Sequence, residues 1–408
     1  MTIKKYIDEI PSNFGPKDPL GRYYTKRIIS NYLISEMEYL SPRKVMDLGS
    51  GSGALSLSAA KKWKAADFIT VDKITKPYDI ESFFDNNSRH SHFFSDVLSN
   101  TFFDDINIKP ETLDVVLCNP PFISNNKITF FNVFDKVGLL FSEKEKRLLP
   151  VEAFFISQGL LALKEGGEMG LIVPDGIISG KKFIFFREAL LKSHAIKTVI
   201  KLPPNGFHGT DAQAHIMIIE KNNEKKNKTV LKKISFENDF FSDIIIDEKD
   251  AVRSLDYSYH EYFKHSKVRG LSLRALGVKI SRGKACSKEA KIMPGFFLHT
   301  NNFPSSIDHI DVYDIENKNS NHVFVSEGDI VMARVGRNFY HKIALISSGN
   351  CPITDCIFKI DAPVIYRKII FDFLKSDIGT KALLSISHGV SARHISMQSL
   401  YELIIPLG

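Results

Sequence analysis

The sequence predicts an α/β protein in which a largely parallel sheet is followed by a second domain. Short apolar runs alternate with helix-like segments from Val45 onward, and such alternation is typical of a parallel sheet covered by helices on both faces. A glycine-rich turn, residues 49–53, separates the first apolar run from the first helix-like segment. The chain has 408 residues, more than one hydrophobic core ordinarily holds, so two domains are expected.

Seven apolar runs predict strands, and three longer segments between them predict helices. The strands are expected at residues 44–47, 68–72, 91–94, 113–118, 168–173, 198–201 and 215–220. The helices are expected at residues 54–64, 152–164 and 183–193. The second helix should end at Lys164-Glu-Gly-Gly, where glycine follows the last apolar turn.

A change in composition marks the expected domain boundary. Residues 221–233 (KNNEKKNKTVLKK) are rich in lysine and asparagine and offer little to bury. They therefore predict a surface crossing between a domain at 1–233 and a domain at 234–408. A long surface hairpin inside one domain is the alternative. Beyond this segment the pattern changes to short β-like runs broken by Gly, Asn and Pro.

Composition and charge narrow the class of protein. The net charge of +7 permits a polyanionic partner, because Lys and Arg neutralise phosphates, but it fits an ordinary basic protein equally well. The four cysteines form no Cys-x-x-Cys pair, so inert thiols and no metal site are expected. No apolar run approaches the ~20 residues that span a bilayer, and the N-terminus is charged where a secretory signal is apolar. A cytoplasmic location is expected.

Three acidic residues stand where successive expected strands end. Asp47 precedes the glycines, Asp72 ends the second strand and Asp96 follows the third. Open α/β sheets bind ligands at this edge, and glycine lets a ligand approach the main chain. An acid before the glycines suits a cationic sulfonium and amino group better than a pyrophosphate. Asp72 can accept from ribose hydroxyls and Asp96 from an adenine amino group; for each acid alone, a helix cap or a solvated surface role is the alternative.

The strongest signal is the loop Asn119-Pro120-Pro121-Phe122, which directly follows an apolar strand. Prolines restrict φ and lack an N–H, so they make the loop rigid and leave carbonyls able to accept. The Asn119 amide and the Pro120 carbonyl predict two acceptors for one amino group, with the ring of Phe122 beside it. A strand-ending turn with a core phenylalanine is the alternative.

This arrangement suits methylation of a nucleobase amine. The lone pair of such an amine is delocalised into the ring. Accepting both of its hydrogens favours a pyramidal nitrogen and stabilises the charge that develops in the transition state. The remaining requirement is a nitrogen held in line with the methyl-bearing sulfonium, without a metal. A base inside a duplex cannot reach such a pocket, so it must flip out.

On these motifs, residues 15–220 resemble the N6-adenine DNA methyltransferases, in the subgroup of the TaqI methyltransferase and the type I modification subunits. The resemblance implies a Rossmann-like, seven-stranded mixed sheet and S-adenosyl-L-methionine as cofactor. It assigns to the cofactor Thr25, Asp47, Gly49, Gly51, Asp72, Asp96 and Val97. It assigns Asn119, Pro120 and Phe122 to catalysis, and Phe122 and Phe207 to stacking on the flipped base; a core position is the alternative for Phe207.

The sequence departs from this family pattern at two positions. Lys26 stands where a proline is common, and Lys73 where an apolar residue often covers the adenine of the cofactor. Both departures concern the packing around the cofactor.

Residues 234–408 resemble a single α/β target-recognition domain of a type I specificity subunit, on the stretches 327–337 and 388–406. The resemblance implies double-stranded DNA as a partner. Arginine can fork onto phosphates or guanine edges, and the expected DNA contacts are Arg334, Arg337, Lys342, Arg393 and His394. An ordinary solvated charge is the alternative for each of them. A separate restriction endonuclease is a further implied partner, and both a monomer and a homodimer fit one recognition domain.

These features together predict a site-specific DNA adenine-N6 methyltransferase, the modification component of a restriction-modification or related system. Two other interpretations stay open. Methyltransferases of RNA bases or of protein glutamine share the Asn-Pro-Pro-aromatic loop, because each acts on a planar amino group. A DNA-binding subunit with an inactive methylase fold is the second. The Glu-x-Lys triplets lie in no nuclease context, so no nuclease is expected in this chain.

Overall fold

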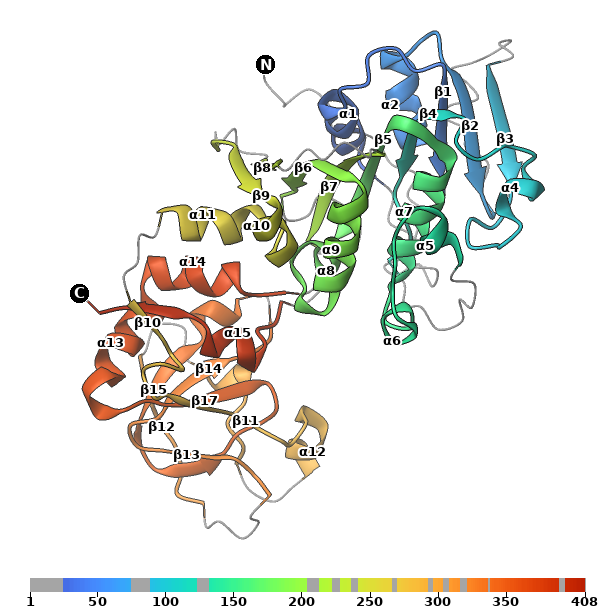
Figure 1. Ribbon diagram of the computed structural model, residues 1–408. Coiled ribbons are helices and arrows are strands. Elements are labelled where there is room, and N and C mark those ends of the chain that lie inside the picture. Colours follow the sequence, from blue (N-terminus) through green and yellow to red (C-terminus); the bar gives the residue numbers. More distant parts are fainter. Residues whose placement is uncertain are drawn as a thin grey trace. The chain divides into compact units, whose positions relative to one another are not determined.

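The computed structural model describes residues 25–74, 89–122, 132–203, 213–221, 228–235, 241–265, 270–292, 296–303, 308–315, 321–336, 338–388 and 393–407. The chain divides into two compact units, Met1–Tyr257 and Ser258–Gly408 (Figure 1). Two predicted site residues, Phe207 and Arg337, lie outside the described residues. Within the described ranges, no helix is long and apolar enough to cross a membrane.

A mixed sheet frames the first unit, and its described strands lie in the order β3-β2-β1-β4-β5-β7-β6-β8-β9. They are β1 (Lys44–Leu48), β2 (Asp67–Asp72), β3 (His90–Phe94), β4 (Leu113–Cys118), β5 (Leu163–Pro174), β6 (Ala195–Lys201), β7 (Ala214–Glu220), β8 (Lys228–Lys233) and β9 (Ile244–Asp247). β7 is antiparallel to β5 and β6, and β9 to β8. The other neighbouring strands are parallel.

Helices cover both faces of this sheet, because its central strands are apolar on both sides. They are α1 (Arg27–Glu36), α2 (Ala54–Lys62), α4 (Phe102–Asp105), α5 (Asn132–Lys136), α6 (Glu143–Lys146), α7 (Val151–Ala162), α8 (Asp175–Ser179), the 3-10 turn η2 (Lys181–Phe183), α9 (Ile184–Ser193) and α10 (Glu248–Arg253). Alternate residues of β4 enter opposite cores. Val116 and Cys118 pack with residues of α7 and α9, whereas Val115 and Leu117 pack with residues of α1 and α2.

The carboxyl ends of β1, β2 and β4 meet at one edge of the sheet, because the three strands are parallel neighbours. Leu48 pairs with Val71 on one side and with Cys118 on the other. The loops that leave these strands carry the glycine-rich turn, Asp72 and Asn119. This edge is where open α/β sheets bind ligands.

The second unit is built on a smaller sheet in the order β11-β17-β14-β15-β12. Its strands are β11 (Lys279–Arg282), β12 (His309–Asp311), β14 (Ile330–Ala333), β15 (Ile343–Ser348) and β17 (Ile357–Asp361). Two separate two-stranded sheets pair β10 (Gly270–Ser272) with β18 (Ile404–Pro406) and β13 (Phe324–Ser326) with β16 (Asn350–Pro352). The helices are α11 (Tyr257–His265), α12 (Ser287–Ile292), η3 (Thr300–Asn302), η4 (Phe339–His341), α13 (Val364–Lys375), α14 (Asp377–Ser385) and α15 (Met397–Tyr401). Ile330 and Met332 of β14 pack with α13 and α14, whereas Val331 enters a separate core on the other face.

The predicted α/β fold with a mixed sheet is confirmed, and all seven predicted strands are present. The described sheet has nine strands rather than seven, because β8 and β9 extend it. The lysine-rich segment 221–233 differs from a simple crossing. Its second half forms β8, because Thr229 and Leu231 are buried, with the part-buried Val230 between them and lysines on either side of the three. β9 and α10 then complete the first unit, so the division falls after Tyr257 rather than after residue 233.

Candidate active site

A cavity of about 290 Å³ opens at the carboxyl edge of the first sheet. It is lined by eight of the predicted site residues, namely Thr25, Asp47, Gly49, Gly51, Asp72, Asp96, Val97 and Asn119. Residues from the loops after four different strands therefore meet around one space. The cavity is of the size and mixed polarity of a small-molecule site.

Asp47 is the most buried acid of this cavity, with 2% of its surface exposed. Its Oδ2 accepts from the Ser56 backbone N–H at 3.2 Å and from the Ser56 hydroxyl at 2.5 Å. Its Oδ1 has no hydrogen-bond partner among the described residues. Burial raises the pKa of Asp47 to about 7, although the Ser56 hydrogen bonds oppose the shift. A cationic ligand group beside Oδ1 would therefore favour the carboxylate.

The glycine-rich turn closes onto β2 through its own backbone. The N–H groups of Gly49 and Ser50 donate to the Val71 carbonyl at 2.8 and 3.0 Å, and Gly51 N–H donates to Asp72 Oδ2 at 3.0 Å. Gly49 and Gly51 have φ values of 72° and 53°, which glycine adopts without strain. A Cβ on Gly49 would lie at an ordinary contact distance of 3.4 Å from the ring of Phe155, so the positive φ, rather than a lack of space against α7, favours glycine here.

Asp72 and Asp96 border the outer part of the cavity. Asp72 also accepts from the Ile74 N–H at 2.9 Å, and Asp96 accepts from the Leu98 N–H at 3.0 Å. Asp96 in addition forms an ion pair with Lys73 at 2.7 Å, in which the lysine side chain is 68% exposed. Exposed pairs of this kind are weak, so Lys73 can leave Asp96 when a ligand binds.

The loop after β4 is held by a contact from far away in the sequence. Asn119 Nδ2 donates to Thr25 Oγ1 at 2.9 Å, which turns the amide oxygen to the other side. Pro120 is buried and Pro121 lines the cavity. Phe122 is partly buried against the core beneath α1 and is not among the residues that line the cavity.

Several residues at this site were not found from the sequence. Phe155 of α7 lines the cavity, and Gln158, one turn later, donates to the Val97 and Ser99 carbonyls at 3.1 and 3.3 Å. Glu152 of the same helix is buried, and burial raises its pKa to about 7. The visible signal was a polar Glu and Gln inside an otherwise apolar helix.

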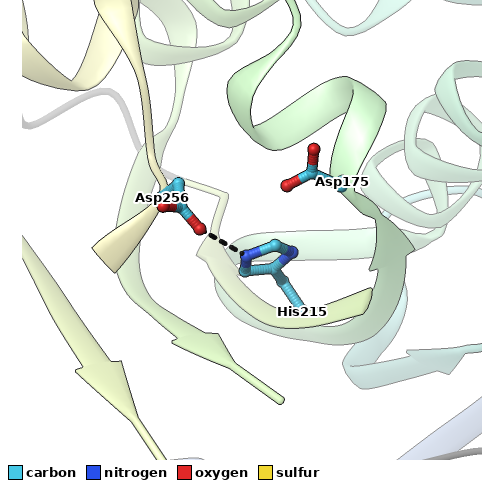
Figure 2. Close-up of side chains that lie close together, drawn as sticks. All are labelled: Asp175, His215 and Asp256. Carbon is cyan, nitrogen blue, oxygen red and sulfur yellow. Dashed lines mark hydrogen bonds and ion pairs between the residues drawn. The ribbon is translucent and has the colours of Figure 1, made fainter. Parts of the chain in front are cut away.

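A second group of buried ionisable side chains lies at the same edge, where β5 and β6 end and β7 begins. Asp256 Oδ2 accepts from Lys201 Nζ at 2.6 Å and lies 3.2 Å from His215 Nε2. Figure 2 shows the imidazole between Asp256 and Asp175, with its hydrogen-bonded nitrogen toward Asp256. One potential ligand atom from each of these three residues lies within 4.8 Å of the others.

The contacts of Lys201 indicate a structural role for this group. Burial opposes ionisation of Asp256, but the charge of Lys201 and the hydrogen bond from His215 hold the pKa of Asp256 below its ordinary value. The Lys201 ammonium thus already neutralises the Asp256 carboxylate, as a bound cation would. Lys201 and His215 stand at the two ends of the segment 202–214, which contains Phe207, so the group ties both ends of that segment to the chain before α11.

The predicted DNA contacts that are described gather at one edge of the second unit's sheet. Arg334 follows β14, and Lys342 precedes β15, the antiparallel neighbour of β14. The Gly336 N–H donates to the Arg393 carbonyl at 3.0 Å, and Val335 forms a β-bridge with His394. Lys342 Nζ donates to the Thr300 carbonyl at 2.9 Å.

The mixed sheet with antiparallel β7 between β5 and β6, the glycine-rich turn after β1 and the Asn-Pro-Pro-Phe loop after β4 define a protein of the α/β methyltransferase class. At the level of sequence, the family model N-6 DNA Methylase matches residues 13–243. The chain belongs to the N-6 DNA Methylase family.

Individual relatives resemble only parts of the chain. A protein of Methanocaldococcus jannaschii, assigned as a type II restriction enzyme and methyltransferase, is 30% identical over 152 residues, which cover 33% of this chain and 12% of that protein. The type I restriction-modification methyltransferase subunit of Streptococcus thermophilus is 22% identical, with a TM-score of 0.43 over 58% of this chain and 52% of that chain. The type IIG restriction endonuclease BpuSI is 11% identical, with a TM-score of 0.44 over 93% of this chain and 57% of that chain. The chain therefore spans about an eighth of the curated relative and about half of these structures.

Proposed function

We propose that this protein is a site-specific DNA adenine-N6 methyltransferase that uses S-adenosyl-L-methionine and acts in a restriction-modification system. The observation that carries the proposal is a single cavity bordered both by the strand-end acids and by Asn119 of the Asn-Pro-Pro-Phe loop. Methyl transfer requires a donor and an acceptor amine to meet in line, and the two sets of residues suit the two reactants. Membership of the N-6 DNA Methylase family supports the choice of adenine and DNA.

The residues around the cavity fit this cofactor. The buried Oδ1 of Asp47, which has no hydrogen-bond partner in the part of the chain that the structure describes, suits a cationic group. The glycine turn allows close approach of a ligand to the backbone. Asp72 suits the ribose hydroxyls, and Asp96, once Lys73 has moved, suits the adenine amino group. A cofactor bound there supplies an electrophilic methyl group on a sulfonium.

Asn119 and the Pro120 carbonyl carry the chemistry at the target amine in this proposal. Because Thr25 accepts from Asn119 Nδ2, the amide oxygen is the atom presented to the amine. Two acceptors on one amino group stabilise the positive charge that develops as its lone pair attacks. The nitrogen then loses one proton to solvent. Phe122 and Phe207 are proposed to stack on the flipped base.

The second unit is proposed as the DNA-recognition domain. Its support is the gathering of Arg334, Lys342, Arg393 and His394 at one edge of one sheet. Arg337, which lies outside the described residues, completes the proposed set. Double-stranded DNA is the proposed partner, along with a separate restriction endonuclease; both a monomer and a homodimer fit this proposal.

The test is methyl transfer to duplex DNA by the full chain and two asparagine variants. Asn119→Ala is expected to abolish transfer while keeping the affinity for cofactor and DNA. Asn100→Ala is the matched control and should keep full activity, because Asn100 is exposed and does not line the cavity. Transfer to RNA or to a protein glutamine instead of DNA would contradict the proposal, as would an active Asn119→Ala variant.

A further inference from the structure

Arg282, which no sequence pattern singled out, lies beside Arg334. β11 and β14 are both antiparallel to β17 and flank it on either side. Arg282 ends β11, Arg334 follows β14, and Asp355 stands just before β17. Three neighbouring strands therefore bring the two arginines and this acid to the same edge of the sheet, the edge that also holds Lys342.

Both guanidinium groups are oriented by one residue. Arg282 Nε and Arg334 Nε donate to the Asp355 carbonyl at 3.0 and 3.1 Å. Arg282 Nη2 also donates to Asp355 Oδ2 at 3.0 Å. Among the described residues, neither Nη group of Arg334 donates to a protein acceptor. The hydrogen bond from Nε thus fixes the plane of the Arg334 guanidinium, while its two Nη groups stay available to a ligand.

The charge at this edge is not balanced by Asp355 alone. Burial, and then the charge of Arg282, lower the pKa of Arg334. The positive charges of Lys291 and Lys342 also reach this region. Burial lowers the pKa of His299 most, the charge of Asp355 raises it, and the charges of the two lysines lower it further. Cations held this close repel one another, and an anionic ligand would relieve the repulsion.

We propose that Arg334 reads a base edge of duplex DNA, that Arg282 contacts a phosphate, and that Asp355 is the residue that positions both; this rests on the proposed function. A guanidinium with a fixed plane and two available Nη groups can donate to two neighbouring acceptors, such as guanine O6 and N7 in the major groove. Arg282 already uses Nε and one N–H of Nη2 on Asp355 and is about half-exposed, so Nη1 and the positive charge remain to meet a phosphate oxygen.

The experiment measures binding of the 408-residue chain to duplexes that carry its methylation site, identified beforehand by sequencing modified DNA. Each base pair of the site is changed in turn, and the dissociation constant is followed against salt. Arg334→Lys keeps the charge but loses the fork. Arg282→Gln loses the charge. Lys368→Gln is the matched control, because this lysine is 86% exposed on α13 and, among the described residues, forms its ion pair with the helix neighbour Asp372.

Arg334→Lys should lose about 5- to 150-fold discrimination at one base pair with an unchanged salt slope. Arg282→Gln should lower the salt slope by about 1 and leave base discrimination intact. Asp355→Ala should reduce discrimination at the same base pair as Arg334→Lys, while general DNA affinity rises because a negative charge is removed.

Full discrimination at every position in Arg334→Lys, or an unchanged slope in Arg282→Gln, would overturn this inference. In that case wild-type methylation of DNA would still uphold the proposed function. Wild-type protein that methylates no DNA would instead remove the proposed function itself. The substituted residues all lie in the second unit, so an unfolding transition of that unit like the wild type's in each variant reports that it remains folded.

Discussion

Cofactor binding is expected to strengthen as the pH rises to about 7, because it requires the carboxylate form of Asp47. Burial, and to a smaller extent the charge of Asp72, raise the pKa of Asp47 to about 7 in the unliganded protein. A cationic ligand group beside Oδ1 favours the ionised form. Below pH 7 the carboxylate fraction falls tenfold per unit, so affinity should fall about tenfold per unit, or ~1.4 kcal/mol.

Titration calorimetry with S-adenosyl-L-methionine, in two buffers of different ionisation enthalpy, measures both the affinity and the proton released. About one proton should leave per cofactor below pH 7, and almost none well above it. Asp47→Asn should abolish the pH dependence and weaken binding by about 10- to 100-fold, as for loss of a hydrogen bond to a charged group. Glu152→Gln is the control and should keep the dependence, because Glu152 shares a pKa of about 7 but does not line the cavity.

An affinity that stays constant across this pH range in the wild type would refute the reasoning. Protonation of Asp47 also makes the stability of the fold depend on pH. The pKa of Asp47 in the fold, about 7, exceeds its ordinary value of 3.8, so the unliganded fold holds the proton more tightly than the unfolded chain does. The contribution of Asp47 to stability should therefore decline as the pH rises from about 4 to about 7.

Three further substitutions test the contacts around the site. Thr25→Val removes the acceptor that orients Asn119 and should lower kcat by about 2- to 10-fold; an unchanged kcat would argue against this orientation. Lys73→Ala frees Asp96 and should strengthen cofactor binding by up to about fivefold, since an exposed ion pair contributes at most ~1 kcal/mol; weaker binding in calorimetry would mean that Lys73 helps to hold the ligand. Asp256→Asn leaves a buried lysine without its counter-charge and should lower the free energy of unfolding by about 3–5 kcal/mol in denaturant titration, and a loss below about 1 kcal/mol would show that the group is not coupled as described.

Patterns that repeat along the chain were enough to predict the sheet and most of the cavity. The apolar runs identified seven of the nine described strands of the first sheet, because buried strands carry continuous apolar residues. The acids and glycines could be placed at one edge, because parallel strands end together. β8 was missed because its inward positions, Thr229 and Leu231, are surrounded by lysines whose stems can cover apolar surface while their charges stay in water.

Contacts between distant parts of the chain could not be predicted in the same way. Asn119 and Thr25 are 94 residues apart, and nothing in either local pattern gives their distance. Arg282 and Arg334 become neighbours only through the strand order of the second sheet, with β17 between β11 and β14. Phe122 was expected beside the target amine, but its ring packs toward the core beneath α1, so its stacking role stays a prediction.

The central claim is that the Asn119 loop and the strand-end acids together methylate the N6 of adenine in DNA. Duplex DNA incubated with the protein and isotopically labelled S-adenosyl-L-methionine can be digested and its nucleosides analysed by mass spectrometry. We predict that the label is found in N6-methyladenine, at one sequence motif, with wild-type protein and not with Asn119→Ala. Label in a cytosine, or no label in DNA while the cofactor binds, would contradict the claim.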